Sequence, residues 1–179
     1  MMQKINIVWF KRDLRITDHL PLYNASIEKI PFIPLYVIDN KYWSQDYISL
    51  RHWHFVYDCL EELNTELSKI GQPLIVKKGL TIDIFKKISQ SFKIQKVFAH
   101  EETSNNYVRN VNLLLQKWFK KNLIEFHEYP TNGVVRNLKS RDDWIKLKNQ
   151  RLNSEVTPSP IRVQKIENYK SDLITRKSI

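Results

Sequence analysis

The sequence predicts an α/β fold: a three-layer, doubly wound (Rossmann-like), five-stranded parallel sheet with helices on both faces. Two observations support it. Short apolar runs rich in β-branched and aromatic residues alternate five times with longer segments of helical periodicity. The first run, residues 5–10, has the continuous apolar character of a strand buried on both faces. A chain of 179 residues with 42% hydrophobic content can form one such domain.

The first strand, residues 5–10, is followed directly by a charged loop, residues 11–15. Thr17 or Asp18 is expected to cap the next helix, because a short oxygen-bearing side chain can accept a hydrogen bond from the first free N–H groups. Pro21 is compatible with the first turn of that helix. Strand, charged loop and helix start follow one another as they do at the ligand-binding edge of parallel sheets.

Residues 31–38 predict a second buried strand. Pro34 lacks a backbone N–H, which favours an edge position or the beginning of the strand. A long amphipathic helix is expected over residues 49–69, since apolar side chains recur there at helical spacing and Gly71 then provides a stop. Residues 73–77 predict the third strand.

The second half of the domain repeats this order. A helix that begins near Thr81 is followed by a fourth strand at residues 96–99. A helix at residues 105–121 then leads to a fifth strand at residues 123–127. Strands that alternate with helices in this way pair in parallel, because each return to the sheet runs through a crossover helix.

The predicted organisation has three parts. Residues 1–135 form the α/β domain, and residues 136–152 form a closing helical segment. Residues 153–179 have the composition of a linker-like basic tail, which is expected to be solvated. From Arg136 onward eleven Lys and Arg residues face five Asp and Glu residues, so +6 of the formal net charge of +10 lies there.

Polar side chains come directly after three of the predicted strands, where ligands bind in open parallel sheets. Because carboxyl ends of parallel strands meet at one edge, these side chains are expected to converge there. The alternative is that Arg12, Asp13 and Arg15 only form an ion-pair network that braces the first loop. The candidate binding residues at this edge are Phe10, Lys11, Arg12, Val37, Asp39, Glu101 and Glu102.

Composition and motifs exclude several classes of protein. Cys59 is the only cysteine, which excludes an intrachain disulfide framework and a cysteine-based zinc cluster. Three glycines leave no G-x-G-x-x-G or G-x-x-x-x-G-K loop, so the usual phosphate-cradling loops are missing. The five histidines form no H-E-x-x-H pattern, and neither a metal site nor a catalytic group is predicted.

The charge and the hydropathy pattern also bear on partners. No run approaches transmembrane length, and residues 1–4 lead straight into a strand, so we expect no membrane partner and a cytoplasmic location. A net charge of +10 favours anionic partners, and weak, nonspecific DNA binding is expected. The alternative is that the charge only keeps the protein soluble.

The first strand and its loop resemble a known family. Residues 9–15, Trp-Phe-Lys-Arg-Asp-Leu-Arg, with Asp18 three residues on, resemble W-F-R-x-D-L-R-x-x-D-N, the amino-terminal signature of the DNA photolyase/cryptochrome family. Lys11 replaces the usual Arg, and His19 replaces the usual Asn. Residues 100–103, His-Glu-Glu-Thr, resemble a segment of a bacterial subgroup.

The resemblance covers roughly residues 5–160 and implies the amino-terminal α/β domain of a photolyase or cryptochrome. In that family the catalytic flavin belongs to a larger helical domain, which would follow this one. The resemblance therefore implies no activity for this chain alone. It implies FAD binding only if a C-terminal FAD-binding domain is supplied by the same or an adjacent reading frame. Full-length relatives are deoxyribodipyrimidine photolyases or cryptochromes.

The resemblance also implies a role for the carboxyl edge of the sheet, where family members that use an auxiliary light-harvesting chromophore generally bind it. Glu102 resembles an acidic position used by deazaflavin binders. Tyr47 and Tyr107 stand near where folate binders place His and Glu. A deazaflavin or flavin antenna is therefore favoured over folate.

Three functional classes remain open at this point. The first is an antenna or scaffold domain of a photolyase/cryptochrome-like flavoprotein. The second is an adenine-nucleotide-binding α/β protein of the universal-stress or electron-transfer-flavoprotein kind, which the missing glycine-rich loop disfavours. The third is a non-enzymatic basic module that pairs with a helical subunit or with DNA.

Overall fold

A computed structural model describes residues 2–179, which form one five-stranded parallel sheet in the order β3-β2-β1-β4-β5. The predicted α/β fold class is confirmed. Among the described residues, no helix is long and apolar enough to cross a membrane. The elements are β1 (Lys4–Phe10), α1 (Leu20–Ile27), β2 (Phe32–Ile38), α2 (Asn40–Trp43), α3 (Leu50–Lys69), β3 (Ile75–Lys78), α4 (Thr81–Ser91), β4 (Lys93–His100), α5 (Asn106–Lys121), β5 (Glu125–Tyr129) and α6 (Trp144–Leu152).

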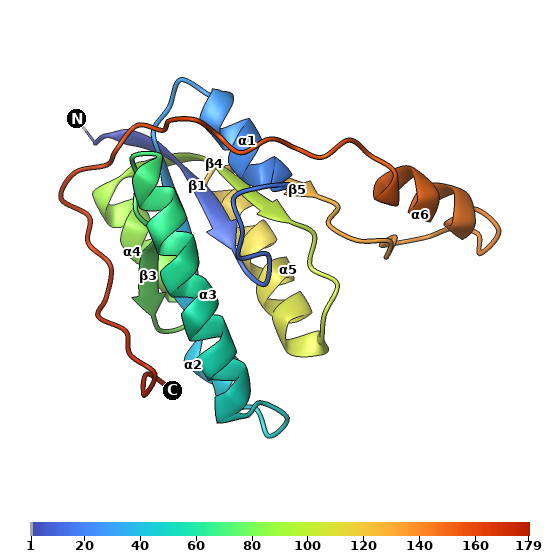
Figure 1. Cartoon of the computed structure of the whole chain (residues 1–179), viewed down its shortest axis with the longest axis horizontal. Helices are drawn as coiled ribbons and strands as arrows, with labels where there is room; N and C mark the ends of the chain where they lie inside the picture. Colours follow the sequence, from blue (N-terminus) through green and yellow to red (C-terminus); the bar gives the residue numbers. More distant parts are fainter. Residues whose placement is uncertain (1) are drawn as a thin grey trace.

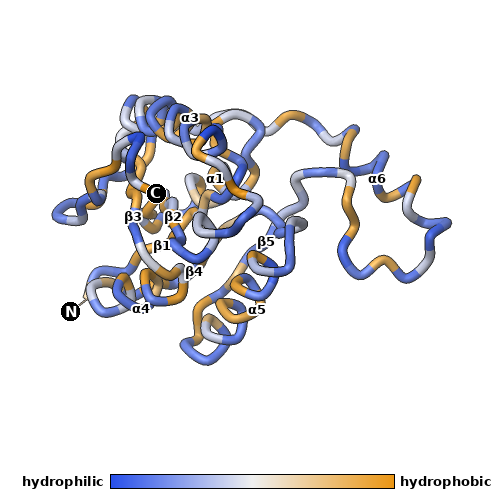
Figure 2. The backbone as a smooth tube through the Cα atoms, turned by 90° about the horizontal axis from the view of Figure 1, so that it is seen from below, coloured by the Kyte–Doolittle hydropathy of each residue, from blue (hydrophilic) through white to orange (hydrophobic). Residues whose placement is uncertain are grey.

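The sheet has helices on both faces, with α1 and α3 on one side and α4 and α5 on the other (Figure 2). Successive residues of β1 point to opposite faces, as they do in any strand. Trp9 therefore packs with Phe85 of α4, with ring centres 5.5 Å apart. Phe10 belongs to the opposite cluster, with α1 and α3. Both faces are buried, which accounts for the continuous apolar runs in the sequence.

The first helix begins differently from the prediction. His19, rather than Thr17 or Asp18, is the capping residue of α1, and its Nδ1 atom accepts a hydrogen bond from the Leu22 N–H at 3.1 Å. Asp18 has a φ of +52°, and the Thr17 hydroxyl bonds to Ser159. Both side chains expected to cap α1 are thus engaged by other parts of the loop and by the C-terminal segment.

The expectation that Pro34 marks an edge or the start of a strand is wrong, because Pro34 lies inside β2, which has neighbours on both sides. The Asn6 N–H donates to the Pro31 carbonyl, so the N–H groups of alternate residues Ile33 and Leu35 face β1. The nitrogen of Pro34 faces β3, whose pairing with β2 begins only at Leu35. The sheet therefore loses no hydrogen bond through the missing N–H of Pro34.

The C-terminal segment does not form the solvated tail expected from its composition. Residues 161–179, here called the strap, run back along the domain to α3 and β3 (Figure 1). Val163 and Ile166 are buried in the two core clusters. The Val163 N–H donates to the Ile70 carbonyl at 2.8 Å, and the Ile166 N–H donates to Gln72 Oε1 at 2.6 Å. Two apolar anchors and paired backbone groups hold a polar segment in place.

The helix expected at the end of the closing segment is present as α6, which stands apart from the other helices on an arm (Figure 1). None of its residues is buried, and Trp144, Ile145 and Leu152 are all exposed. Hydrogen bonds of Arg151 with Glu101 and with the Val134 carbonyl connect the helix to the domain. The Trp144 indole N–H also donates to the Gly133 carbonyl at 3.3 Å. Helix propensity and these few contacts hold α6, since none of its side chains is buried.

Gly71 sits where the strap crosses the end of α3. Its φ is +116°, and a Cβ atom at this position would lie 2.7 Å from the Val163 carbonyl oxygen of the strap. Gly79 has a similar φ of +138°, but the nearest atom to its Cβ would be a flexible side-chain carbon of Ile84 at 3.5 Å. Both glycines adopt a positive φ that other residues rarely adopt, but only Gly71 lies against the backbone of the strap.

We therefore expect Gly71→Ala to destabilise the protein by about 1–3 kcal/mol more than Gly79→Ala, because only the first also displaces the strap backbone. Urea denaturation followed by tryptophan fluorescence measures both losses. Equal losses in the two variants would mean that the strap does not press against Gly71.

Candidate functional site

The strand order reverses between β1 and β4: the chain first adds β2 and β3 on one side of β1 and then β4 and β5 on the other. Ligands of doubly wound sheets bind outside the carboxyl ends of the strands at this point. A cavity of about 280 Å³, here called the edge cavity, opens there. Its lining includes Lys11, Arg12, Glu101, Glu102, Thr103 and Asn132. Four of the predicted site residues therefore border one cavity.

Arg12 and Glu102 form an ion pair across the reversal point. Arg12 Nη2 lies 3.2 Å from Glu102 Oε1, which also accepts the Ser104 N–H at 2.8 Å. The Arg12 side chain is 58% exposed, whereas that of Glu102 is only 2% exposed. Arg12 therefore reaches the exposed edge of the sheet, whereas the loop after β4 folds over the Glu102 carboxylate.

Lys11 lies beneath the edge cavity rather than projecting from it. Its Nζ atom donates to the His100 carbonyl at 2.8 Å and lies 4.5 Å from the centre of the Trp9 ring. A longer contact of 3.4 Å reaches Asn112 of α5. Burial lowers the pKa of Lys11, and the nearby carboxylate of Glu102 partly opposes this effect. The ammonium group joins the ends of β1 and β4 to α5.

Asp39 lies at the carboxyl end of β2, as predicted, but its oxygens are already occupied. Oδ1 accepts the N–H groups of Lys41 and Tyr42 at the start of α2 and the Tyr107 hydroxyl at 2.7 Å. Oδ2 accepts both the N–H and the hydroxyl of Thr81. Five donors fill the lone pairs of one carboxylate, so a ligand would have to displace one of them.

Glu101 connects the edge to the closing segment. Its carboxylate lies 3.5 Å from Arg136 Nη2 and 3.0 Å from Arg151 Nη1. Arg136 also pairs with Glu128 of β5 at 3.0 Å. All of these pairs are partly buried, and Glu101 also lines the edge cavity. They hold the closing segment against the carboxyl end of β4.

The two apolar residues of the predicted site do not meet. Phe10 pairs in register with Tyr36, so both point to the α1/α3 face. Val37, the next residue of β2, consequently points to the α4/α5 face. Neither lines the edge cavity, whose lining is polar throughout.

A buried cluster of one carboxylate and two imidazoles was missed by reasoning from the sequence. Asp13 Oδ2 contacts His19 Nε2 at 2.8 Å and His100 Nδ1 at 2.5 Å, and its Oδ1 accepts the Lys11 N–H. All three side chains are more than nine-tenths buried. The signal that could have found the cluster is the replacement of the usual Asn by His19, together with His100 at the end of a neighbouring strand.

Hydrogen bonding determines which ring nitrogens carry protons in this cluster. His19 Nδ1 accepts the Leu22 N–H, so its hydrogen is on Nε2 and is donated to Asp13. His100 donates from Nδ1 to the same carboxylate, which leaves its Nε2 as an acceptor. Burial would raise the pKa of Asp13, but the hydrogen bonds from His100 and His19 hold it well below its ordinary value. Burial lowers the pKa of His19.

The same bonds argue against a metal ion here, although the three ligand atoms lie within 4.8 Å of one another. Metal coordination requires a free lone pair on the ligating nitrogen. With Nδ1 of His19 held by the Leu22 N–H, its Nε2 can supply a lone pair only if the ring becomes an imidazolate. Asp13 and His19 therefore brace the first loop, as the alternative interpretation of the charged motif predicted for Asp13.

A doubly wound parallel sheet with a polar cavity at its reversal point places this protein in the class of doubly wound α/β domains. The family model described as DNA photolyase matches residues 6–142. The chain therefore belongs to the DNA photolyase family, and it comprises the amino-terminal α/β domain of that family. The universal-stress and electron-transfer-flavoprotein alternatives are not favoured.

Particular relatives agree with this assignment. The chloroplastic/mitochondrial cryptochrome DASH of Solanum lycopersicum is 27% identical over 149 residues, which cover 80% of this chain and 25% of that protein. A solved cryptochrome from Synechocystis superposes with a TM-score of 0.79 at 19% identity, covering 97% of this chain and 39% of that one. The chain thus spans about a quarter of the length of the curated relative.

A solved archaeal photolyase from Sulfolobus tokodaii is similar in fold, with a TM-score of 0.72 at 23% identity over 90% of this chain and 38% of that one. That protein contains two FAD molecules, and a novel light-harvesting cofactor is implied for it. At this level of identity the likeness concerns the fold.

Proposed function

We propose that this chain is the antenna and scaffold domain of a photolyase/cryptochrome-like flavoprotein that serves light-dependent DNA repair or blue-light signalling. The observation that carries the proposal is the Arg12–Glu102 pair, which borders a cavity at the reversal point of a sheet of this family. The archaeal relative with its second FAD gives a precedent for a light-harvesting cofactor within the family.

The chemistry of the edge cavity suits the polar rim of a deazaflavin or flavin ring. Arg12 uses only one of its guanidinium nitrogens in the pair with Glu102, so it has further N–H donors for ring oxygens. The volume of about 280 Å³ is at the lower limit for a small-molecule site, so the ring would fill it and the rest of the chromophore would lie outside. Such a chromophore would absorb light and pass the excitation to a flavin. Phe10 and Val37 face the core and offer it no stacking surface.

Equilibrium titration of the purified chain with a deazaflavin or with FMN, followed by absorbance and fluorescence, tests the proposal. We expect saturable binding that Arg12→Gln weakens by about tenfold, the usual effect of losing one charge-assisted hydrogen bond. Arg141→Gln is the matched control, since Arg141 is exposed and lies outside the edge cavity. Glu102 stays unchanged because its carboxylate also holds the Ser104 N–H.

Two results would contradict the antenna role. One is the absence of binding of either chromophore at concentrations that saturate other flavoproteins. The other is equal weakening by Arg12→Gln and by Arg141→Gln. Only the scaffold role of the proposed function would then remain. Stoichiometric, photoreducible FAD in the isolated chain would overturn the assignment of the catalytic flavin to another domain.

The catalytic FAD is proposed to belong to a C-terminal helical domain in the same or an adjacent reading frame. A flavin dinucleotide needs a pocket that encloses most of its surface, and the edge cavity of about 280 Å³ is too small for this. The exposed apolar side chains of α6 offer a surface on which such a domain would pack. A cytoplasmic location also remains a proposal, since the name of the tomato relative refers to chloroplasts and mitochondria.

DNA binding by the isolated domain is expected to be weak, strongly salt-dependent and without preference for damaged bases. A net charge of +10 attracts phosphates, but recognition of a damaged base requires a pocket into which it is flipped. Titrating damaged and undamaged duplexes at two salt concentrations measures both properties. A clear preference for the damaged duplex would show that a lesion-binding site lies within this chain.

A further inference from the structure

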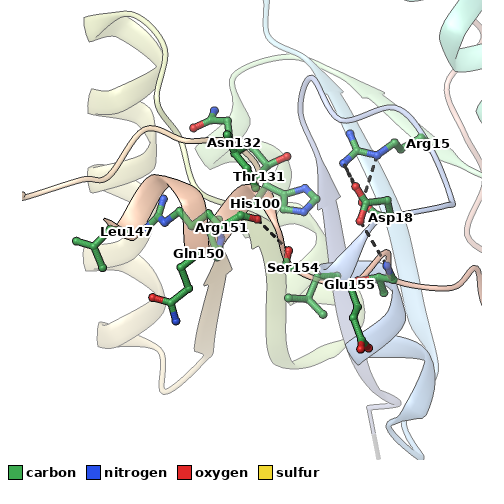
Figure 3. A pocket seen from close by; sticks show the side chains of 14 residues that line it. Arg15, Asp18, His100, Thr131, Asn132, Leu147, Gln150, Arg151, Ser154 and Glu155 are labelled. Atoms are coloured by element: carbon green, nitrogen blue, oxygen red, sulfur yellow. Dashed lines mark hydrogen bonds and ion pairs between the residues drawn. The ribbon is translucent and has the colours of Figure 1, made fainter. Parts of the chain in front are cut away.

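A second cavity, of about 410 Å³, adjoins the edge cavity and shares Arg15, His100, Thr131 and Asn132 with it. We call it the α6 cavity, because α6 and the residues that follow it form one wall (Figure 3). Its other walls are the loop after β1 and the segment that follows β5. Figure 3 shows the His100 ring between Thr131–Asn132 and the Arg15–Asp18 pair. The antenna proposal uses none of the residues that only this cavity contains.

His100 presents a hydrogen-bond acceptor to this cavity. Its side chain is 6% exposed, and its Nδ1 atom is committed to Asp13. The Nε2 atom has no partner among residues 2–179, and the residue lines both cavities. In the neutral ring Asp13 fixes the tautomer, so the Nε2 lone pair at the wall of the cavity has no donor among residues 2–179.

Donors with unused N–H groups lie around the same space. Arg15 bonds through Nε and Nη2 to the Thr17 and Asp18 carbonyls and to the Asp18 carboxylate, and its Nη1 makes no bond within residues 2–179. Arg151 uses only Nη1, toward Glu101 and the Val134 carbonyl. Two guanidinium groups and one acceptor thus line one cavity, together with the carboxylates of Asp18 and Glu155.

We propose that the α6 cavity binds the phosphate group of a phosphate monoester. In this arrangement the P–OH group donates to His100 Nε2, and the unprotonated oxygens accept from Arg15 and Arg151. A proton-bearing oxyanion is required because an anion without a proton would place two lone pairs against each other at Nε2. Both arginines already have a carboxylate partner, so the site suits a singly charged oxyanion.

The size of the α6 cavity and its apolar side indicate what the ligand contains besides the phosphate group. A volume of about 410 Å³ lies within the range of small-molecule sites and exceeds what a free phosphate fills. Pro130, Leu147 and Leu152 add an apolar side to the polar end. The chemistry is that of a small organic phosphate such as a nucleoside monophosphate. Internal phosphodiesters of DNA are excluded, because they carry no P–OH proton.

Isothermal titration in a phosphate-free buffer, with sulfate, inorganic phosphate and a nucleoside 5′-monophosphate as probes, tests the proposal. We expect inorganic phosphate to bind about tenfold or more tightly than sulfate, which has the same shape but no proton at neutral pH. At about pH 6, where a phosphate monoester keeps its P–OH proton on about half of the molecules, the nucleoside monophosphate should bind at least as well as inorganic phosphate. A short oligonucleotide without a terminal phosphate is expected not to compete with either.

Matched variants identify the site. Arg15→Gln and Arg151→Gln should each weaken phosphate binding by about tenfold, whereas Arg162→Gln, an exposed strap residue outside the cavity, should leave it unchanged. In ¹⁵N-labelled protein, phosphate should shift the Nε2 resonance of His100 and leave that of His127, which pairs with Glu125, in place. Circular dichroism confirms that each variant is folded.

Three results would overturn the proposal: equal affinities for phosphate and sulfate, no measurable binding of either phosphate probe, or loss of binding in Arg162→Gln as large as in Arg15→Gln. The proposal is separated from the antenna role by a chromophore without a phosphate group, such as riboflavin, because FMN is itself a phosphate monoester and the two cavities share Arg15 and His100. Arg12→Gln should weaken chromophore binding and leave phosphate binding intact, so the two proposals can fail separately.

Discussion

Replacing Asp13 with alanine is expected to lower the free energy of unfolding by about 3–5 kcal/mol, a large fraction of the stability of a domain of this size. The carboxylate accepts hydrogen bonds from His19, His100 and the Lys11 N–H. Its removal leaves buried donors of three residues without a partner, and each unsatisfied group carries a desolvation penalty. Urea denaturation followed by tryptophan fluorescence measures the loss.

Asp83→Ala is the matched control. The Asp83 side chain is 51% exposed and pairs only with Lys86 on the same helix at 3.6 Å. Exposed pairs of this kind contribute about 1 kcal/mol or less. A loss in Asp13→Ala no greater than that in Asp83→Ala would mean that the buried cluster does not hold the first loop.

The pH dependence of stability gives a second test of Asp13. The folded state holds the pKa of Asp13 well below its ordinary value. The ionised carboxylate therefore contributes stability that is fully present above about pH 4 and is lost as the pH falls further. Asp13→Asn should be less stable at neutral pH and should lose less stability on acidification below about pH 4. Parallel profiles for the two proteins would contradict this.

Placing a charge at Ile166 is expected to release the strap and to cost about 2–4 kcal/mol. Ile166 is 3% exposed and packs in the core cluster on the α4/α5 face. The loss is bounded by the docking free energy of the strap, since Ile166→Asp can hydrate its charge by detaching residues 161–179. Faster cleavage by trypsin at Lys165 and Lys170 should accompany the loss.

Release of the strap should also uncover the edge of β3. The Val76 N–H donates to the Ser171 hydroxyl, and the Val76 carbonyl accepts the Asp172 N–H at 2.8 Å. Without these partners β3 presents unpaired backbone groups, which favour pairing with another chain. Light scattering should therefore detect more self-association in Ile166→Asp than in the native protein.

Ile161→Asp is the control, because the same substitution falls in the same segment on a side chain that is 94% exposed. It should keep the stability, the protease resistance and the association state of the native chain. Equal behaviour of Ile161→Asp and Ile166→Asp would show that the strap does not depend on its buried anchors.

The sequence alone determined the α/β class and the order of the elements. Apolar runs and helical periodicity directly reflect which faces are buried, so residues 5–10 and 49–69 were assigned correctly. The convergence of Arg12 and Glu102 followed from the rule that carboxyl ends of parallel strands meet at one edge. Both conclusions need only the local sequence pattern and general rules of sheet topology, so one sequence is enough to reach them.

Only the tertiary structure decided what each edge side chain contacts. Phe10 and Val37 face opposite sides because of the register between β1 and β2, and register is not encoded in either strand by itself. Asp39 follows its strand as predicted, yet its lone pairs are filled by residues as distant as Thr81 and Tyr107. The side chains that occupy a carboxylate cannot be inferred from its place in the sequence.

The strap and the buried cluster are two further features that could not be predicted from the sequence. Composition predicted a solvated tail, because the few apolar anchors of the strap have no periodicity and its backbone bonds depend on the position of β3. Asp13 and His19 come from the loop after β1 and His100 from the end of β4, and only the folded sheet brings the loop and the strand end together. Sequence pattern determined which surfaces are buried, whereas long-range packing determined which polar groups meet, because hydrogen bonds depend on distances that separation along the chain does not specify.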